Sequence, residues 1–196
     1  MRTVAQALSE QRRDQALGER MTPKYRVTAA RPEDLSRLAA IELAAAQLLT
    51  GHAPESILCE TTSPDVLRQA QRDGHLWVAL GDDVPVGFAH VEIVERDAVH
   101  LEEIDVHPDH GRRGLGARLI RHVCHWAASK GYDAVTLTTF RDVPWNSPFY
   151  ARLGFEVVPP EKVSASLREI IEDEERRGLD PSRRVVMKRP CRDLMH

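Results

Sequence analysis

The sequence has few of the features that mark secreted, membrane or metal-binding proteins. Only three of its 196 residues are cysteines, they are far apart, and none belongs to a CxxC pair. Neither a disulfide framework nor a thiolate metal site is therefore expected. No apolar run approaches the roughly 20 residues of a membrane helix, and residues 1–10 lack the apolar stretch of a secretory signal. We expect a cytoplasmic protein with no membrane partner.

An excess of charge of one sign is also absent. Lys and Arg total 27 and Asp and Glu total 30, which leaves a formal net charge of -3. A general attraction to nucleic acid is therefore not expected, and any anion must be bound by local groups. Hydrophobic residues make up 42% of the chain, a share typical of soluble globular proteins. The length suits one domain, with or without an appendage.

Hydrophobic periodicity and turn residues predict a mixed α/β fold, also described as α+β. Strands are predicted at residues 25–29, at two places within 77–94 joined by a turn at 81–83, in a segment leading to 106, and at 134–140, 155–158 and 184–188. Helices are predicted at residues 32–51, 66–72, 114–130, 147–153 and 164–177. The strand–helix–strand order from Val106 to Phe140 makes those two strands parallel, whereas the earlier strands form an antiparallel meander.

The most informative motif is the run VHPDHGRRGLG from Val106 to Gly116, between a predicted strand and a long predicted helix. Its glycines allow backbone N–H groups to converge on an anion, and the start of the helix adds a favourable dipole. The run lacks the GK[ST] of a nucleotide P-loop, and Leu119 stands where a dinucleotide fingerprint needs a small residue. The pattern therefore predicts a phosphate-binding loop of another kind.

This loop resembles the acetyl-CoA motif of the GCN5-related N-acetyltransferase (GNAT) superfamily, Q/R-x-x-G-x-G/A after a strand ending V-x-P. Gly114 and Gly116 match the motif directly. Gly111 occupies the position where the family usually has Gln or Arg, which leaves Arg112 and Arg113 to supply the basic side chains.

A second family signature follows in the expected order. Residues 146–155, NSPFYARLGF, are similar to N-x-x-x-x-Y-x-x-L-G-F. The resemblance covers residues 24–190 and implies a mixed sheet of six or seven strands flanked by helices, with the cofactor where a central pair of strands splays apart. Residues 1–23 are then an N-terminal extension or helix and residues 191–196 a C-terminal tail. By analogy with family members, a homodimer is expected.

The strand before the loop carries a break in its alternation. Apolar residues fall at odd positions up to Leu101 and at even positions from Ile104 onward, so one extra residue must be absorbed. A β-bulge at Glu102 and Glu103 would restore one apolar and one polar face, and bulges favour functional sites. The resemblance implies the same bulge.

The resemblance implies that an amine attacks a thioester. Because a primary ammonium has a pKa of about 10.4, a base must remove its proton, and the departing thiolate needs an acid. Glu102 is the predicted base, Glu103 is its close competitor, and Tyr150 is the predicted acid. Val106 is expected to supply an oxyanion-stabilising backbone N–H. The residues expected to bind acetyl-CoA are Ile104, Val106, Gly111, Arg112, Arg113, Gly114, Leu115, Gly116, Ala117 and Asn146.

Other candidates carry weaker signals. His122 and His125 lack an HExxH motif and a companion carboxylate at ligand spacing, so no metal ion is expected. Thr138 cannot be a base, although some family members have a glutamate near this position. Trp145 and Asp142 could form the wall of a pocket for a cationic amine, or Trp145 could cover the core.

The sequence therefore predicts an acetyl-CoA-dependent N-acetyltransferase. It would acetylate a primary amine of a small molecule or of a peptide or protein, by direct attack in a ternary complex. A catalytically inactive acyl-CoA-binding sensor or scaffold is the alternative, because a fold does not guarantee its chemistry.

Overall fold

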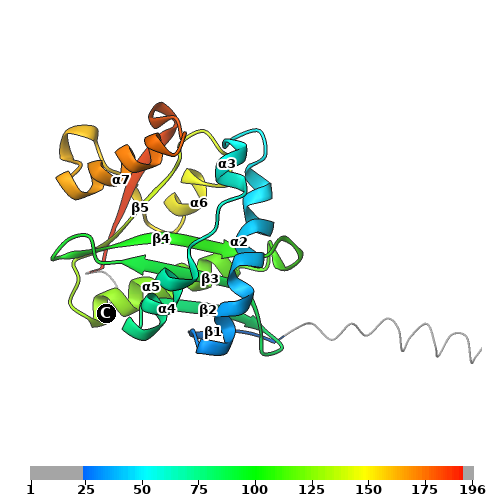
Figure 1. Ribbon diagram of the computed structural model, residues 1–196. Helices are drawn as coiled ribbons and strands as arrows, with labels where there is room; N and C mark the ends of the chain where they lie inside the picture. The colour runs from blue at the N-terminus through cyan, green and yellow to red at the C-terminus, as the bar shows by residue number, and fades with distance from the viewer. Residues whose placement is uncertain (1–23, 192–196) are drawn as a thin grey trace, which may run out of the picture.

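The computed structural model describes residues 24–191, which form one seven-stranded sheet with helices on both faces (Figure 1). The strands are β1 (Tyr25–Ala29), β2 (Leu76–Gly81), β3 (Val84–Glu92), β4 (Ala98–Val106), β5 (Ala134–Phe140), β6 (Glu156–Val157) and β7 (Arg184–Pro190). The α-helices are α2 (Leu38–Ala46), α3 (Glu55–Leu58), α4 (Pro64–Asp73), α5 (Leu115–Ser129), α6 (Ser147–Ala151) and α7 (Ala165–Arg176). Short 3-10 helices are Pro32–Arg37, Gln47–Leu49, Pro108–His110, Pro160–Lys162 and Pro181–Arg183.

The sheet is mixed, as the sequence predicts. Its strand order is β1-β2-β3-β4-β5-β7-β6. Strands β1 to β4 form an antiparallel meander, β4 and β5 run parallel, and β7 pairs antiparallel with both β5 and β6. The parallel step follows from the crossover helix α5, because a strand–helix–strand connection returns the chain in the same direction.

The two central strands separate after a short contact. Pairing of β4 with β5 ends at His100 and Thr136, although both strands continue. On the other side of β4, His90 pairs with Glu103 and Val91 with Leu101, so Glu102 is the extra residue of a bulge. The predicted splay and the predicted bulge are both confirmed, and the splay frees the edge of β4 that faces β5.

Each face of the sheet has its own core. Helix α5 packs on one face, where Leu119 and Val123 meet Val91 of β3. Helices α2 and α4 cover the other face, where Leu38 packs with Phe88. Alternation along the strands divides their side chains between the two cores. The same alternation places Glu103 and Asp105, which pair with His90 and Phe88, on the face that α2 covers.

Several boundaries differ from the prediction. The single helix expected over 32–51 is divided into a 3-10 helix, α2 and a second 3-10 turn, and α3 forms in a segment expected to be a loop. The first 3-10 helix begins after Arg31, whose backbone N–H donates to the Asp34 carboxylate at 2.8 Å. The strand expected over 155–158 forms pairs only at Glu156–Val157. Such changes at element ends depend on tertiary contacts that periodicity does not report.

The expectations for residues 1–23 and 192–196 lie outside the described residues. Cys191, the first residue of the expected tail, is buried, and its N–H donates to the Asp133 carbonyl at 2.8 Å.

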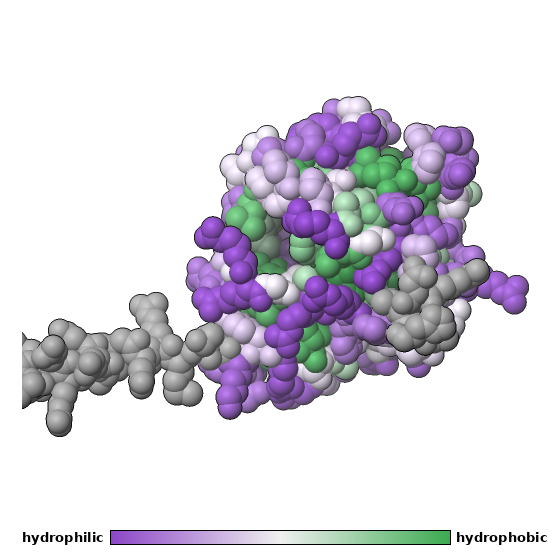
Figure 2. Space-filling model, turned by 180° about the vertical axis from the view of Figure 1, so that it is seen from behind, coloured by the Kyte–Doolittle hydropathy of each residue, from purple (hydrophilic) through white to green (hydrophobic). Residues whose placement is uncertain are grey.

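Between residues 24 and 191, no helix has the length and apolar character needed to cross a membrane. Hydrophilic residues predominate on the face seen from behind in Figure 2, with smaller hydrophobic areas between them.

Candidate active site

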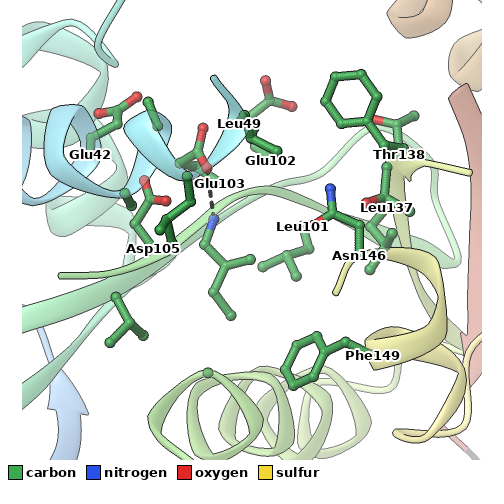
Figure 3. A pocket seen from close by; sticks show the side chains of 18 of the residues that line it. Glu42, Leu49, Leu101, Glu102, Glu103, Asp105, Leu137, Thr138, Asn146 and Phe149 are labelled. Atoms are coloured by element: carbon green, nitrogen blue, oxygen red, sulfur yellow. Dashed lines mark hydrogen bonds between the residues drawn. The ribbon is translucent and has the colours of Figure 1, made fainter. Parts of the chain in front are cut away.

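A cavity of about 840 Å³ opens where β4 and β5 separate. Its walls come from α2, the bulged part of β4, the start of α5, α6 and α7 (Figure 3). Segments far apart in the sequence therefore meet around one space. All the predicted coenzyme-binding residues except Arg113 line it: Ile104, Val106, Gly111, Arg112, Gly114, Leu115, Gly116, Ala117 and Asn146.

One end of the cavity is built for an anion. Gly114 is the N-cap of α5 with a φ of 75°, a left-handed conformation that glycine adopts without strain. The first-turn N–H groups that follow have no acceptor within the helix, so a ligand at the helix start can accept from them. Gly116 lets Phe149 lie close to the helix start, because a Cβ there would lie 3.4 Å from Cζ of Phe149. Arg112 adds a basic side chain to this wall.

Two loop residues are already engaged elsewhere. The Gly111 N–H donates to the Pro108 carbonyl at 2.9 Å. The Arg113 guanidinium lies over the Tyr25 ring, 5.8 Å from its centroid, and Arg113 is absent from the cavity wall described above. Arg112 is therefore the loop arginine that faces the cavity.

Two carboxylates from the bulge line the middle of the cavity. Solvent reaches Glu102, yet the surrounding walls desolvate it, and this burial, with the charges of Glu92 and Glu174, raises its pKa to about 7. Burial and the charge of Glu42 raise the pKa of Glu103 to about 7 as well. Glu103 Oε1 accepts the Ile104 N–H at 3.1 Å, which leaves Glu102 as the more available base.

Tyr150 of α6 also lines the cavity. Its ring packs edge-on against Phe149 and Phe155, at centroid distances of 5.3 and 6.0 Å. Burial raises the pKa of its hydroxyl, and the charges of Glu103 and Asp105 raise it further. The hydroxyl therefore stays protonated at neutral pH and can donate a proton or a hydrogen bond.

Two cavity residues escaped the sequence analysis. Glu42 of α2 is only 8% exposed, and its carboxylate accepts the Thr62 N–H at 2.9 Å and the Thr62 hydroxyl at 3.0 Å. Burial raises the pKa of Glu42. The sequence does contain a signal for Glu42, because it is the one charged residue in the apolar helix LAAIELAAA. Asp105 of β4 was given no role from the sequence, and burial beside Glu103 raises its pKa as well.

A buried ion pair supports the β5 wall. Arg184 Nε donates to Glu174 Oε2 at 2.9 Å, and its terminal nitrogen donates to the Thr138 hydroxyl at 3.1 Å. Both charged side chains are about one tenth exposed. The pair joins α7 to β7, and the bond from Arg184 to Thr138 ties both elements to β5.

Of the two residues suggested for the acceptor wall, the structure places Trp145 on the cavity and Asp142 away from it. Trp145 lines the cavity, is 49% exposed and packs edge-on against His52, so the alternative that it covers the core is wrong. Asp142 forms a salt bridge of 2.8 Å with Arg183 and is not part of the cavity wall.

Within 24–191, no three His, Cys, Asp or Glu side chains are grouped so that they could hold a metal ion. The His122 ring packs against Trp77, with centroids 5.8 Å apart.

Comparisons with known proteins bear on this geometry. A sequence profile of the acetyltransferase (GNAT) family matches residues 44–155. The chain is 32% identical over 96 residues to a Methanocaldococcus jannaschii protein named as an uncharacterized N-acetyltransferase, an alignment that covers 46% of this chain and 42% of that relative. The chain therefore matches less than half of the relative's length.

Two solved structures share the fold. The PaiA N-acetyltransferase of Thermoplasma acidophilum, in complex with coenzyme A, gives a TM-score of 0.64 at 18% identity, covering 85% of this chain and 99% of that one. The N-acetylglutamate synthase of Neisseria gonorrhoeae, complexed with coenzyme A and N-acetyl-glutamate, gives 0.65 at 16% identity, covering 86% of this chain and 35% of that one. With the family profile spanning more than half of the sequence, this chain belongs to the GNAT family of acetyltransferases.

Proposed function

We propose that the protein is an acetyl-CoA-dependent N-acetyltransferase that acetylates a primary amine of a small molecule or peptide by direct attack in a ternary complex. The observation that carries this proposal is the cavity at the splay of β4 and β5, with anion-binding geometry at the start of α5 and carboxylates on the bulge. The structural neighbours from T. acidophilum and N. gonorrhoeae support it, since both were determined with coenzyme A.

The residues around the cavity fit the parts of the coenzyme. The N–H groups at the start of α5 and the Arg112 side chain would hold the diphosphate, a ligand that helix N-termini favour. The edge of β4 released by the splay would pair with the amide groups of the pantetheine arm. The Ile104 N–H would exchange its bond to Glu103 for such a partner. The coenzyme supplies an acetyl thioester, and the chain positions it.

Starting from the ammonium form, nitrogen loses two protons and sulfur gains one. Glu102 takes the first proton, directly or through water, so that the neutral amine can attack. A C–N bond forms between the amine and the acetyl carbon while the C–S bond breaks, the nitrogen then releases its second proton to water, and Tyr150 donates a proton to the sulfur. The Val106 N–H stabilises the negative charge on the acetyl oxygen. Every one of these groups lines the cavity.

Calorimetry with matched glycine variants tests the binding step. Gly114 and Gly131 both have positive φ, at 75° and 83°, and a Cβ on either would meet no atom within 4 Å. Alanine therefore imposes similar backbone strain at the two positions, about 1 kcal/mol. Gly114→Ala should weaken acetyl-CoA binding by about tenfold or more, whereas Gly131→Ala should not change it.

Activity is measured as release of thiol from acetyl-CoA with a panel of amines, followed by mass detection of the product. The expected result is acetylation of at least one amine. Tight binding of acetyl-CoA without turnover would support an inactive sensor instead. No heat with acetyl-CoA or a longer acyl homologue, on folded protein, would refute the proposal.

A further inference from the structure

The cavity has an acidic half that the reaction itself does not require. Seven carboxylates line it: Glu42, Glu60, Glu92, Glu102, Glu103, Asp105 and Glu174. Two of them, Glu60 and Glu174, are paired with Arg177 and Arg184. Among residues 24–191, the other five take part in no salt bridge. Removal of one ammonium proton needs a single base, so this surplus of negative charge calls for another explanation.

Three of the unpaired carboxylates form a group. Glu42 reaches down from α2 toward Glu103 and Asp105 of β4, and Figure 3 shows the three side chains gathered on one side of the cavity, away from Asn146 and Phe149. The charge of Glu42 acts on both of the others. Like charges that face one another in a poorly solvated space repel, and a bound cation relieves that repulsion.

A buried imidazole beside this group lacks a partner. His90 lines the cavity from β3, directly opposite Glu103 in the sheet register, and is only 2% exposed. Its Nδ1 is buried and makes no hydrogen bond to any residue in the described part of the chain. Burial lowers the pKa of His90 to about 4, with the charge of His75 as a second cause. The ring is therefore neutral at neutral pH, adds no positive charge, and offers one polar atom to a ligand or its water.

The surroundings favour an organic cation over a metal ion. Among residues 24–191, no three His, Cys, Asp or Glu side chains are grouped so that they could hold a metal ion. Apolar side chains, among them Leu49, Ile57 and Leu101, line the same cavity. A group of carboxylates in a cavity that also has apolar walls suits a flexible chain of methylenes that carries charge at more than one place.

We propose that the acceptor is an aliphatic diamine or polyamine, with one nitrogen beside Glu102 and a second, protonated nitrogen among Glu42, Glu103 and Asp105. This inference rests on the proposed function and names its substrate class. The nitrogen beside Glu102 loses its proton and attacks the acetyl group, while the second keeps its charge. A free carboxylate on the acceptor would be repelled by the same group, and a simple monoamine would leave it without a counter-ion.

A chain-length-matched panel tests this substrate class. The acceptors are 1,4-diaminobutane, butylamine and 4-aminobutanoate, which share one primary amine and differ at the far end. The value of kcat/KM from thiol release should be at least about tenfold higher for the diamine than for butylamine, as expected for one added charge-assisted contact, and lowest for 4-aminobutanoate. The mass of the product should show one acetyl group per diamine.

Variants assign the preference to the carboxylate group. Glu42→Gln and Asp105→Asn should each bring the ratio of diamine to butylamine kcat/KM toward one. Glu172→Gln makes the same change of charge on an exposed residue of α7, and it should keep the wild-type ratio. If Glu42→Gln fails to fold because its bonds to Thr62 are altered, Asp105→Asn carries the test.

The outcomes separate this inference from the proposed function. Acetylation of butylamine as fast as the diamine, or a wild-type ratio in folded Asp105→Asn protein, would overturn the diamine inference and leave the acetyltransferase intact. Absence of turnover with every amine would overturn both.

Discussion

Replacement of Glu102 by glutamine is the sharpest test of the mechanism. Glu102 can take a proton only when it is ionised, and the cavity raises its pKa to about 7. About one tenth of the molecules would then carry this carboxylate at pH 6 and about nine tenths at pH 8. The part of kcat/KM that depends on Glu102 should therefore rise about tenfold from pH 6 to pH 8 and then level off.

The ratio of wild-type to variant activity isolates this effect. The acceptor amine also loses its proton as the pH rises, but that ionisation is common to both proteins and cancels in the ratio. Glu102→Gln should lower kcat/KM by at least about 100-fold at pH 8, as for a lost general base. The ratio of wild type to Glu102→Gln should rise about tenfold between pH 6 and pH 8.

A neighbouring variant provides the comparison. Glu103→Gln makes the same change of charge one residue away, and its side-chain oxygen can still accept the Ile104 N–H. The rise with pH should survive in Glu103→Gln. The reasoning is refuted if Glu102→Gln keeps near wild-type kcat/KM. It is also refuted if the Glu-dependent rise of kcat/KM between pH 6 and pH 8 is lost in Glu103→Gln and kept in Glu102→Gln, a result that would make Glu103 the base.

Three further predictions follow from individual contacts. Arg184→Met leaves Glu174 buried without its cation, so the free energy of unfolding measured in urea should fall by about 3–5 kcal/mol. An unchanged urea midpoint would contradict the inference that this ion pair supports the cavity wall. Gly87→Ala places a Cβ 2.6 Å from the Asp105 carbonyl oxygen, so the free energy of unfolding should fall by about 1–3 kcal/mol. A thermal midpoint equal to that of the wild type would show that β4 can shift to accommodate the Cβ without loss of stability. Tyr150→Phe should lower kcat by about 100-fold with acetyl-CoA affinity unchanged in calorimetry, whereas wild-type thiol release would exclude Tyr150 as the acid.

Structural features that depend on residues close together in the sequence were predictable. The shift of apolar residues from odd to even positions between Leu101 and Ile104 predicted the bulge, because side chains alternate strictly along a strand. The turn at Gly114 was predictable for a similar reason, since a left-handed residue before a helix is most often glycine. The resemblance to the GNAT superfamily, carried by two local motifs, implied the splay that the strand pairing confirms.

Features that depend on distant neighbours were not predictable. Nothing in the acidic segment of α7 distinguishes Glu174, which the fold pairs with Arg184 in a poorly solvated site. Glu42 reaches the cavity only because α2 crosses the polar face of β4. Asp142, which the sequence suggested for the acceptor wall, is drawn away by Arg183.

The sequence by itself determined the order of the strands and most helices, the bulge and the left-handed turn at Gly114, since these depend on residues a few positions apart. Only the tertiary structure decided which carboxylates face one another, how deeply each is buried and therefore at what pH each ionises. The burial and the pKa of each carboxylate depend on desolvation and on charges carried by other elements, which become neighbours only when the chain folds.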